Sequence, residues 1–116
     1  MEVKFEVLET MLSGDKQTIK KVLGMIMSNS SKIFDSIDNN LKSKNYQGIR
    51  QVVHSLKPQM SFLGMTDMVS FVTELEKEAM MVSDSNLFEN KVKDFAGMYK
   101  SIIFEVSREL DTYQSI

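Results

Sequence analysis

Apolar residues recur at helical spacing along almost the whole chain, and no segment shows the alternation of apolar and polar residues that marks a strand. The longest stripe predicts one helix over residues 16–42. Its apolar positions are Ile19, Val22, Leu23, Ile26, Ile33, Ile37 and Leu41, with Phe34 at the edge. Serine and asparagine residues at positions 28–31 interrupt this stripe near its middle. The pattern indicates an all-α protein.

The start of the chain predicts a short helix over about residues 3–12, separate from the long one. Ser13, Gly14 and Asp15 follow it. Glycine readily adopts the left-handed conformation found just after a helix, and aspartate is a preferred N-cap. We therefore expect Gly14 to end the first helix and Asp15 to cap the second.

Two more helices are predicted after residue 42. Asn45 can cap a helix over residues 46–63, which Gly64 would help to end. Thr66 can cap the next helix, over about residues 67–81.

The last helix is predicted to follow a turn at Ser83, Asp84 and Ser85 and to run to about residue 113. Asn86, with Glu89 three residues later, resembles a capping box at its start. The apolar stripe of this helix comprises Phe88, Val92, Phe95, Tyr99, Ile102, Val106, Leu110 and Tyr113.

Four sizeable amphipathic helices joined by short turns favour an antiparallel up-down-up-down four-helix bundle. The short N-terminal helix would cover one end of it. No repeat, low-complexity tract or linker divides the sequence, so residues 1–116 are expected to form a single domain.

The composition excludes several classes of function. The chain has no Cys and one His, which removes thiolate chemistry and leaves too few ligands for a histidine–cysteine metal site; no metal and no cofactor are expected. A net charge of −2 argues against a nucleic-acid surface. The apolar runs are too short to span a bilayer. Taken together, these features lead us to expect a cytoplasmic monomer without nucleic-acid or membrane partners.

The single histidine is predicted to lie on the polar side of the helix over residues 46–63. At about 100° per residue, the apolar positions fall opposite His54. They are Ile49, Val52, Leu56, Met60 and Leu63, with Val53 at the border. Around His54 itself lie Gln47, Arg50, Gln51, Lys57, Pro58 and Ser61. We therefore expect an exposed imidazole near the middle of the bundle, in a polar and partly basic strip.

An exposed neutral imidazole is a good nucleophile toward phosphorus. Lys57 lies one turn after His54, where its ammonium can reach a phosphoryl oxygen, and Arg50 lies one turn before it. No glycine-rich phosphate loop is present, so phosphorylation of His54 is expected to depend on another protein. Exposed histidines near a lysine are nevertheless common on helices, and this arrangement alone does not define a site.

The sequence HSLKPQMSFLG at residues 54–64 resembles the signature of histidine-containing phosphotransfer (HPt) domains. That signature places an apolar residue two positions after the acceptor histidine, a lysine three positions after it, and Leu-Gly nine and ten positions after it. Leu56, Lys57, Leu63 and Gly64 match these positions in register with His54. The predicted helices on both sides also follow the layout of the family, so the resemblance covers nearly the whole chain.

The resemblance implies a phosphorelay intermediate. Such a domain accepts a phosphoryl group on its histidine, here His54, from the aspartyl phosphate of a response-regulator receiver domain, and passes it to the aspartate of another receiver. Lys57 would stabilise the phosphoryl group. A hybrid sensor histidine kinase is a further candidate partner. The resemblance also implies that magnesium is bound by the receiver and that the domain is a phosphocarrier without kinase or hydrolase activity of its own. By analogy with the family, the reacting atom is the imidazole nitrogen farther from the backbone.

The surface around His54 is the candidate docking face for receivers. Its members are Arg50, Gln51, Pro58, Ser61 and Gly64. Met11 and Leu12, with Met25 and Met27, are candidates for an adaptable docking patch, because methionine suits surfaces that repack.

Two other groups of residues receive structural interpretations. Met60, Met68 and Met98 are expected to fill the core. The charged cluster on the helix over residues 67–81 is expected to be a solvated face that does not converge with His54; it comprises Glu74, Glu76, Lys77 and Glu78.

Pro58 departs from the family pattern, which usually has glycine four residues after the acceptor. Proline has no N–H for the His54 carbonyl and its ring crowds the preceding turn, which costs about 3 kcal/mol inside a helix. Because the apolar stripe continues in phase to Leu63, we predict one bent helix with the His54 carbonyl free. The pyrrolidine ring also leaves a receiver less room than glycine would.

The alternative to a phosphocarrier is a helical interaction module, or a degenerate relative that docks receivers without carrying phosphate. Both readings predict the same fold and differ in the chemical competence of His54. A stand-alone hydrolase is disfavoured because the sequence offers no convincing pair of nucleophile and base.

Overall fold

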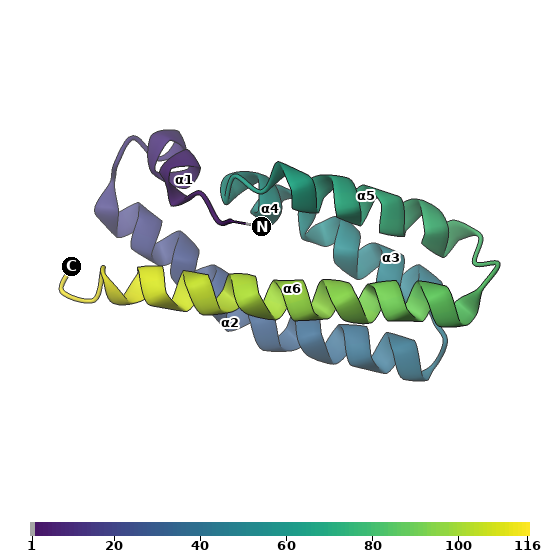
Figure 1. Ribbon diagram of the computed structural model, residues 1–116. Coiled ribbons are helices and arrows are strands. Elements are labelled where there is room, and N and C mark those ends of the chain that lie inside the picture. The colour runs from purple at the N-terminus through teal and green to yellow at the C-terminus, as the bar shows by residue number, and fades with distance from the viewer. Residues whose placement is uncertain (1) are drawn as a thin grey trace.

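The computed structural model describes residues 2–116 and shows helices joined by short turns. They are α1 (Phe5–Met11), α2 (Lys16–Lys42), α3 (Tyr46–Ser55), α4 (Lys57–Phe62), α5 (Thr66–Met80) and α6 (Ser85–Asp111). Consecutive long helices run in opposite directions, with α4 following α3 toward the same end of the molecule (Figure 1). The predicted antiparallel bundle with a short additional N-terminal helix is confirmed. None of the helices in the described part of the chain is long and apolar enough to cross a membrane.

The four long elements form a closed ring of neighbours. α2 packs against α3 and α6, α5 packs against α3 and α6, and the core lies between them. α1 lies at the end of the bundle where α4 is found and packs on α4 (Figure 1). Leu8 of α1 is buried there, and the Lys4 N–H donates a hydrogen bond to the Leu63 carbonyl at 2.7 Å. The short helix therefore covers one end of the core, as the sequence predicted.

The apolar stripe of α3 and α4 faces the core almost as the helical wheel predicted. Its fully or nearly fully buried members are Ile49, Val53, Leu56, Met60 and Leu63. Val53, expected at the border, is completely buried, whereas Val52 is only half-buried. Of the methionines assigned to the core, Met60 and Met68 are fully buried and Met98 is partly buried.

Local capping chemistry explains where most helices begin and end. Gly14 has a left-handed φ of 71° after α1, and the side chains of Asp15 and Asn45 cap α2 and α3, as predicted. The N-cap predicted at Thr66 is wrong: Thr66 is the first residue of α5, and Met65 precedes it without a side-chain cap.

The start of α6 also differs from the prediction. Asp84, rather than Asn86, is the N-cap, and its carboxylate accepts a hydrogen bond from the third residue of the helix. Glu89 does not serve a capping box, because it accepts hydrogen bonds from the Lys44 ammonium, at 2.7 Å, and from the Tyr46 hydroxyl. A long-range contact with the α2–α3 turn thus replaces the local one.

Pro58 breaks the helix that the sequence predicted to be continuous. α3 ends at Ser55, Leu56 lies between the two helices, and α4 begins at Lys57. Pro58 therefore occupies the first turn of a new helix, where a missing N–H costs little. The His54 carbonyl, expected to be free, accepts a backbone hydrogen bond at the C-cap of α3. The prediction of one bent helix is wrong, although α4 keeps the apolar stripe in the core.

Gly64 ends α4 with a left-handed φ of 68°. A Cβ at this position would lie 2.7 Å from Lys4 Cβ and 2.9 Å from Val7 Cγ2. Glycine is thus required twice over: for its backbone conformation, and for the close packing of the N-terminal segment on the α4–α5 turn.

Candidate functional site

His54 is the next-to-last residue of α3, and its side chain is 68% exposed. Its neighbour Val53 points into the core, which turns His54 outward, since successive residues of a helix are about 100° apart. The predicted exposure of the imidazole is confirmed. The break in the helix directly after Ser55 places this exposed ring beside the start of α4.

A carboxylate on the neighbouring helix α5 holds the imidazole. Glu76 Oε1 lies 3.0 Å from His54 Nδ1 and also 3.0 Å from Lys57 Nζ. A carboxylate can only accept hydrogen bonds, so this contact places the proton of a neutral His54 on Nδ1. The lone pair then lies on Nε2, the nitrogen farther from the backbone, on a ring that solvent reaches.

Glu76 is ionised in spite of its position. Its side chain is only 15% exposed, and burial raises its pKa. The hydrogen bonds from Lys57 and His54 lower the pKa and outweigh the burial, so that the net pKa lies below the ordinary value of 4.5. At neutral pH the site therefore contains a fixed negative charge beside Nδ1 of the imidazole.

Lys57 follows His54 by three residues, as the signature requires, but the break at Leu56 places it at the beginning of α4. Its side chain is 25% exposed, and its ammonium is paired with Glu76. Lys57 therefore lies near His54, as predicted, because both side chains contact Glu76 Oε1. The ammonium is on a flexible four-carbon stem and can also turn toward a group on Nε2.

The interpretation of Glu76 as part of a solvated face is wrong. α5 packs closely on α3, and Glu76 follows the buried Leu75 at the edge of the buried stripe of α5. That edge position is the only sequence signal that could have set Glu76 apart from its charged neighbours. The sequence alone does not show which helix faces that edge.

The four docking candidates nearest His54 in the sequence lie on α3 and α4, the helices that carry His54 and Lys57. Gln51, Pro58 and Ser61 are exposed, and Arg50 is half-buried. None of the four hydrogen-bonds to His54, Lys57 or Glu76, so the direct contacts of the site are confined to that trio. Their part in docking stays a prediction.

Met11, Leu12 and Gly64, three of the remaining docking candidates, lie at the end of the bundle. Met11 is 56% exposed and Leu12 is half-buried, both at the C-terminal end of α1. Gly64 lies beneath Lys4 and Val7 of the N-terminal segment, which gives it a packing role. Among residues 2–116, no three His, Asp or Glu side chains converge as a metal site would require.

Comparison with protein families agrees with this geometry. The family model of the Hpt domain matches residues 21–113, which include most of α2, all of α3 to α6 and His54. The chain belongs to the Hpt domain family, whose members carry out histidine phosphotransfer in phosphorelays and interact with receiver domains. Comparisons with curated proteins and with solved structures found no significant match.

Proposed function

We propose that His54 is the phosphoryl acceptor of this Hpt domain and that Nε2 is the atom that carries the phosphoryl group. The single observation that carries the proposal is the contact of 3.0 Å between Glu76 Oε1 and His54 Nδ1 on an otherwise exposed imidazole. It leaves Nε2 as the basic, solvent-facing nitrogen. This is also the only histidine in the sequence.

The chemistry follows from the charges around the ring. Nε2 attacks the phosphorus of an aspartyl phosphate, the N–P bond forms, and the P–O bond to the aspartate breaks with its electron pair on the departing carboxylate. Nδ1 keeps its proton, so the ring gains positive charge as the bond forms. Glu76 stabilises that charge, as a carboxylate does behind a catalytic histidine. Lys57 is close enough to supply a charge-assisted hydrogen bond to the phosphoryl oxygens.

The partners are receiver domains on both sides of the relay: one whose aspartyl phosphate is the donor and one whose aspartate is the acceptor. We extend the proposal to a monomeric domain over residues 1–116, with a hybrid sensor histidine kinase as a candidate donor. Gln51, Pro58 and Ser61 surround the exposed ring on α3 and α4 and support a docking face there.

The proposal is tested by incubating the protein with a phosphorylated receiver domain and measuring acid-labile, base-stable phosphate on the chain. His54→Gln should take up no phosphate, while its far-ultraviolet circular dichroism stays that of the wild type, because exposed polar substitutions rarely cost more than about 0.5 kcal/mol. Lys57→Ala should retain uptake at a lower rate.

The matched control is Gln51→Ala, an exposed change on the same helix, which should leave the phosphate site intact. Equal phosphate uptake by the wild type and His54→Gln would place the chemistry elsewhere. Binding of receivers without any phosphate on the wild-type chain would instead identify a docking module.

A further inference from the structure

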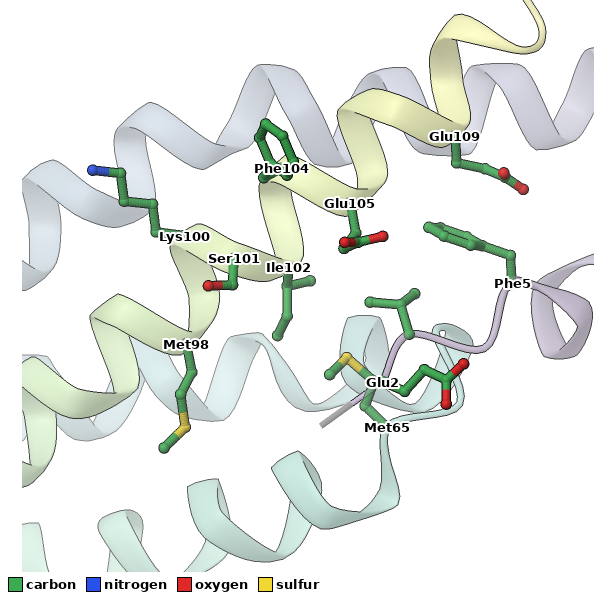
Figure 2. A pocket seen from close by; sticks show the side chains of 11 residues that line it. Glu2, Phe5, Met65, Met98, Lys100, Ser101, Ile102, Phe104, Glu105 and Glu109 are labelled. Atoms are coloured by element: carbon green, nitrogen blue, oxygen red, sulfur yellow. The ribbon is translucent and has the colours of Figure 1, made fainter.

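A groove lies along the C-terminal half of α6, outside the site at His54. α6 forms one side of it, and the N-terminal segment together with Met65 forms the other (Figure 2). Its volume is about 1040 Å³. None of its lining residues belongs to the trio of His54, Lys57 and Glu76. We call it the α6 groove.

The α6 groove combines an apolar lining with an exposed aromatic ring. Phe5 and Met98 are half-buried and contribute apolar surface, Met65 and Ile102 are only 3% exposed beneath them, and Phe104 is 62% exposed. Arg108 lies over the Phe104 ring at 5.9 Å from its centroid, so one face of this ring already accepts a cation. Phe104 thus adds exposed aromatic surface at the rim of the groove, next to the half-buried Phe5 and Met98.

The charged residues of the groove are mostly acidic. Glu2, Glu105 and Glu109 line it, and in Figure 2 the last two extend from α6 toward the N-terminal segment. None of the three forms an ion pair within residues 2–116. The basic lining residue, Lys100, lies toward the other end of the groove (Figure 2). Three carboxylates thus line the groove with one lysine, and Arg108, which directly precedes Glu109 in the chain, lies over the Phe104 ring.

The electrostatics of Glu109 agree with this excess of negative charge. Burial raises the pKa of Glu109, and the nearby carboxylates of Glu9 and Glu6 on α1 raise it further. Facing carboxylates that repel one another are stabilised by a cation placed between them. A positively charged ligand would therefore gain more here than at an isolated surface glutamate.

The dimensions of the groove fit a helix. The lining residues on α6 run from Met98 to Glu109, a length of about 16 Å at 1.5 Å per residue. This equals about three turns. Glu105 and Glu109 are four residues apart and lie one turn from each other on α6, so two basic side chains with the same spacing could face them.

We propose that the α6 groove binds a basic amphipathic helical segment of a partner protein, with its apolar stripe against Phe5, Met98 and Phe104 and its lysine or arginine side chains against Glu105 and Glu109. Helix-in-groove recognition of this kind combines apolar anchors with complementary charge at the rim. The surface is separate from the trio, so the domain can hold this partner while its histidine is exposed.

The test uses the full chain and a synthetic helical peptide of leucine and lysine, with leucine at positions i, i+3, i+4 and i+7 and lysine elsewhere. Binding is followed by NMR chemical-shift changes and by fluorescence anisotropy at two salt concentrations. The resonances of Phe5, Met98 and Phe104 should shift, and affinity should fall as salt rises. A peptide of the same pattern with glutamate in place of lysine should bind at least about tenfold more weakly.

Two variants and two controls make the result specific. The double variant Glu105→Gln/Glu109→Gln and the single variant Phe104→Ala should each weaken binding about tenfold, whereas Asp35→Asn/Asp38→Asn, the same change of charge on exposed positions of α2, should change it less than about twofold. His54→Gln should bind like the wild type, which separates this surface from phosphotransfer.

Equal binding by the wild type and both groove variants, with unchanged circular dichroism, would overturn the proposal. So would shifts centred on His54. A concentration-dependent dimer of the protein alone, lost in Phe104→Ala, would assign the groove to a second copy and would also overturn it.

Discussion

Two side chains of this Hpt domain, His54 and Lys57, are held by one oxygen atom of Glu76. Glu76 Oε1 accepts hydrogen bonds from His54 Nδ1 and Lys57 Nζ, both at 3.0 Å. A change at Glu76 therefore alters the orientation of the imidazole and the position of the ammonium together. Substitution of Glu76, like substitution of His54, is therefore expected to change phosphoryl transfer.

Glu76→Gln should slow phosphoryl transfer to His54 on the order of tenfold, an increase of about 1.4 kcal/mol in the barrier. Glutamine can still accept the Nδ1–H hydrogen bond, but it has no charge to stabilise the imidazolium that forms. Single-turnover transfer from a phosphorylated receiver measures the effect. Glu74→Gln, on the same helix with a side chain 67% exposed, is the control and should transfer at the wild-type rate. Equal rates for the two variants would remove Glu76 from the mechanism.

The same carboxylate should make part of the stability depend on pH. The pKa of Glu76 is lower in the folded protein than its ordinary value of 4.5, so its ionised form stabilises the fold above that pH. The contribution is lost as the pH falls below 4.5 and through the folded pKa. Urea unfolding should therefore show the wild type more stable than Glu76→Gln at pH 7, with a difference that shrinks on acidification. A difference that stays constant below the ordinary pKa would contradict the ion pair.

At the scale of the elements, the break between α3 and α4 explains how this chain accommodates proline beside its histidine. In the interior of one helix Pro58 would remove a hydrogen bond and clash with the preceding turn. In the first turn of α4 it does neither, because that N–H has no partner within the helix in any case. The break leaves Leu56 and Met60 buried, so it costs little packing.

Pro58→Gly should consequently lower the free energy of unfolding by about 1 kcal/mol, because glycine makes the unfolded chain more flexible and is a poor helix residue. In a continuous helix, relief of the clash with the proline ring would offset most of this loss, but here no clash remains to be relieved. Denaturant midpoints measure the change. Pro58→Ala is the matched variant and should lose less stability. Stabilisation by glycine would show that the ring is strained after all.

At the scale of the whole molecule, α1 closes the end of the bundle beside α4. Leu8 contributes a buried side chain, and Gly64 allows the N-terminal segment to approach the α4–α5 turn. The helix α1 has seven residues and contributes Leu8 to the same core as helices of 27 residues. Most of the stability of such a short helix comes from tertiary packing, since isolated helices of this length are marginal.

Leu8→Ala should therefore destabilise the protein by about 2–5 kcal/mol, the usual cost of removing a buried leucine side chain. Met11→Ala on the same helix is the control, because Met11 is 56% exposed and should change stability by less than about 0.5 kcal/mol. Chemical unfolding of both variants gives the comparison. Similar small losses for the two would show that α1 separates readily from the bundle in solution.

The sequence by itself determined most of the helices, the exposure of His54 and the family of the domain. Helical periodicity is a local property, and so are the caps at Asp15 and Asn45, the left-handed glycine after α1 and the spacing from His54 to Lys57. Such features involve residues within one or two turns of each other. These separations along the chain can be read directly from a single sequence.

The tertiary structure decided what depends on residues far apart in the chain. Glu76 lies 22 residues from His54, and only the packing of α5 on α3 brings the two together. Glu89 is drawn away from a local cap by a hydrogen bond to Lys44, 45 residues before it. Long-range contacts compete with local ones of similar energy, and periodicity does not show which helix faces which. The partner of the imidazole and the acidic groove on α6 therefore became visible only once the helices were packed.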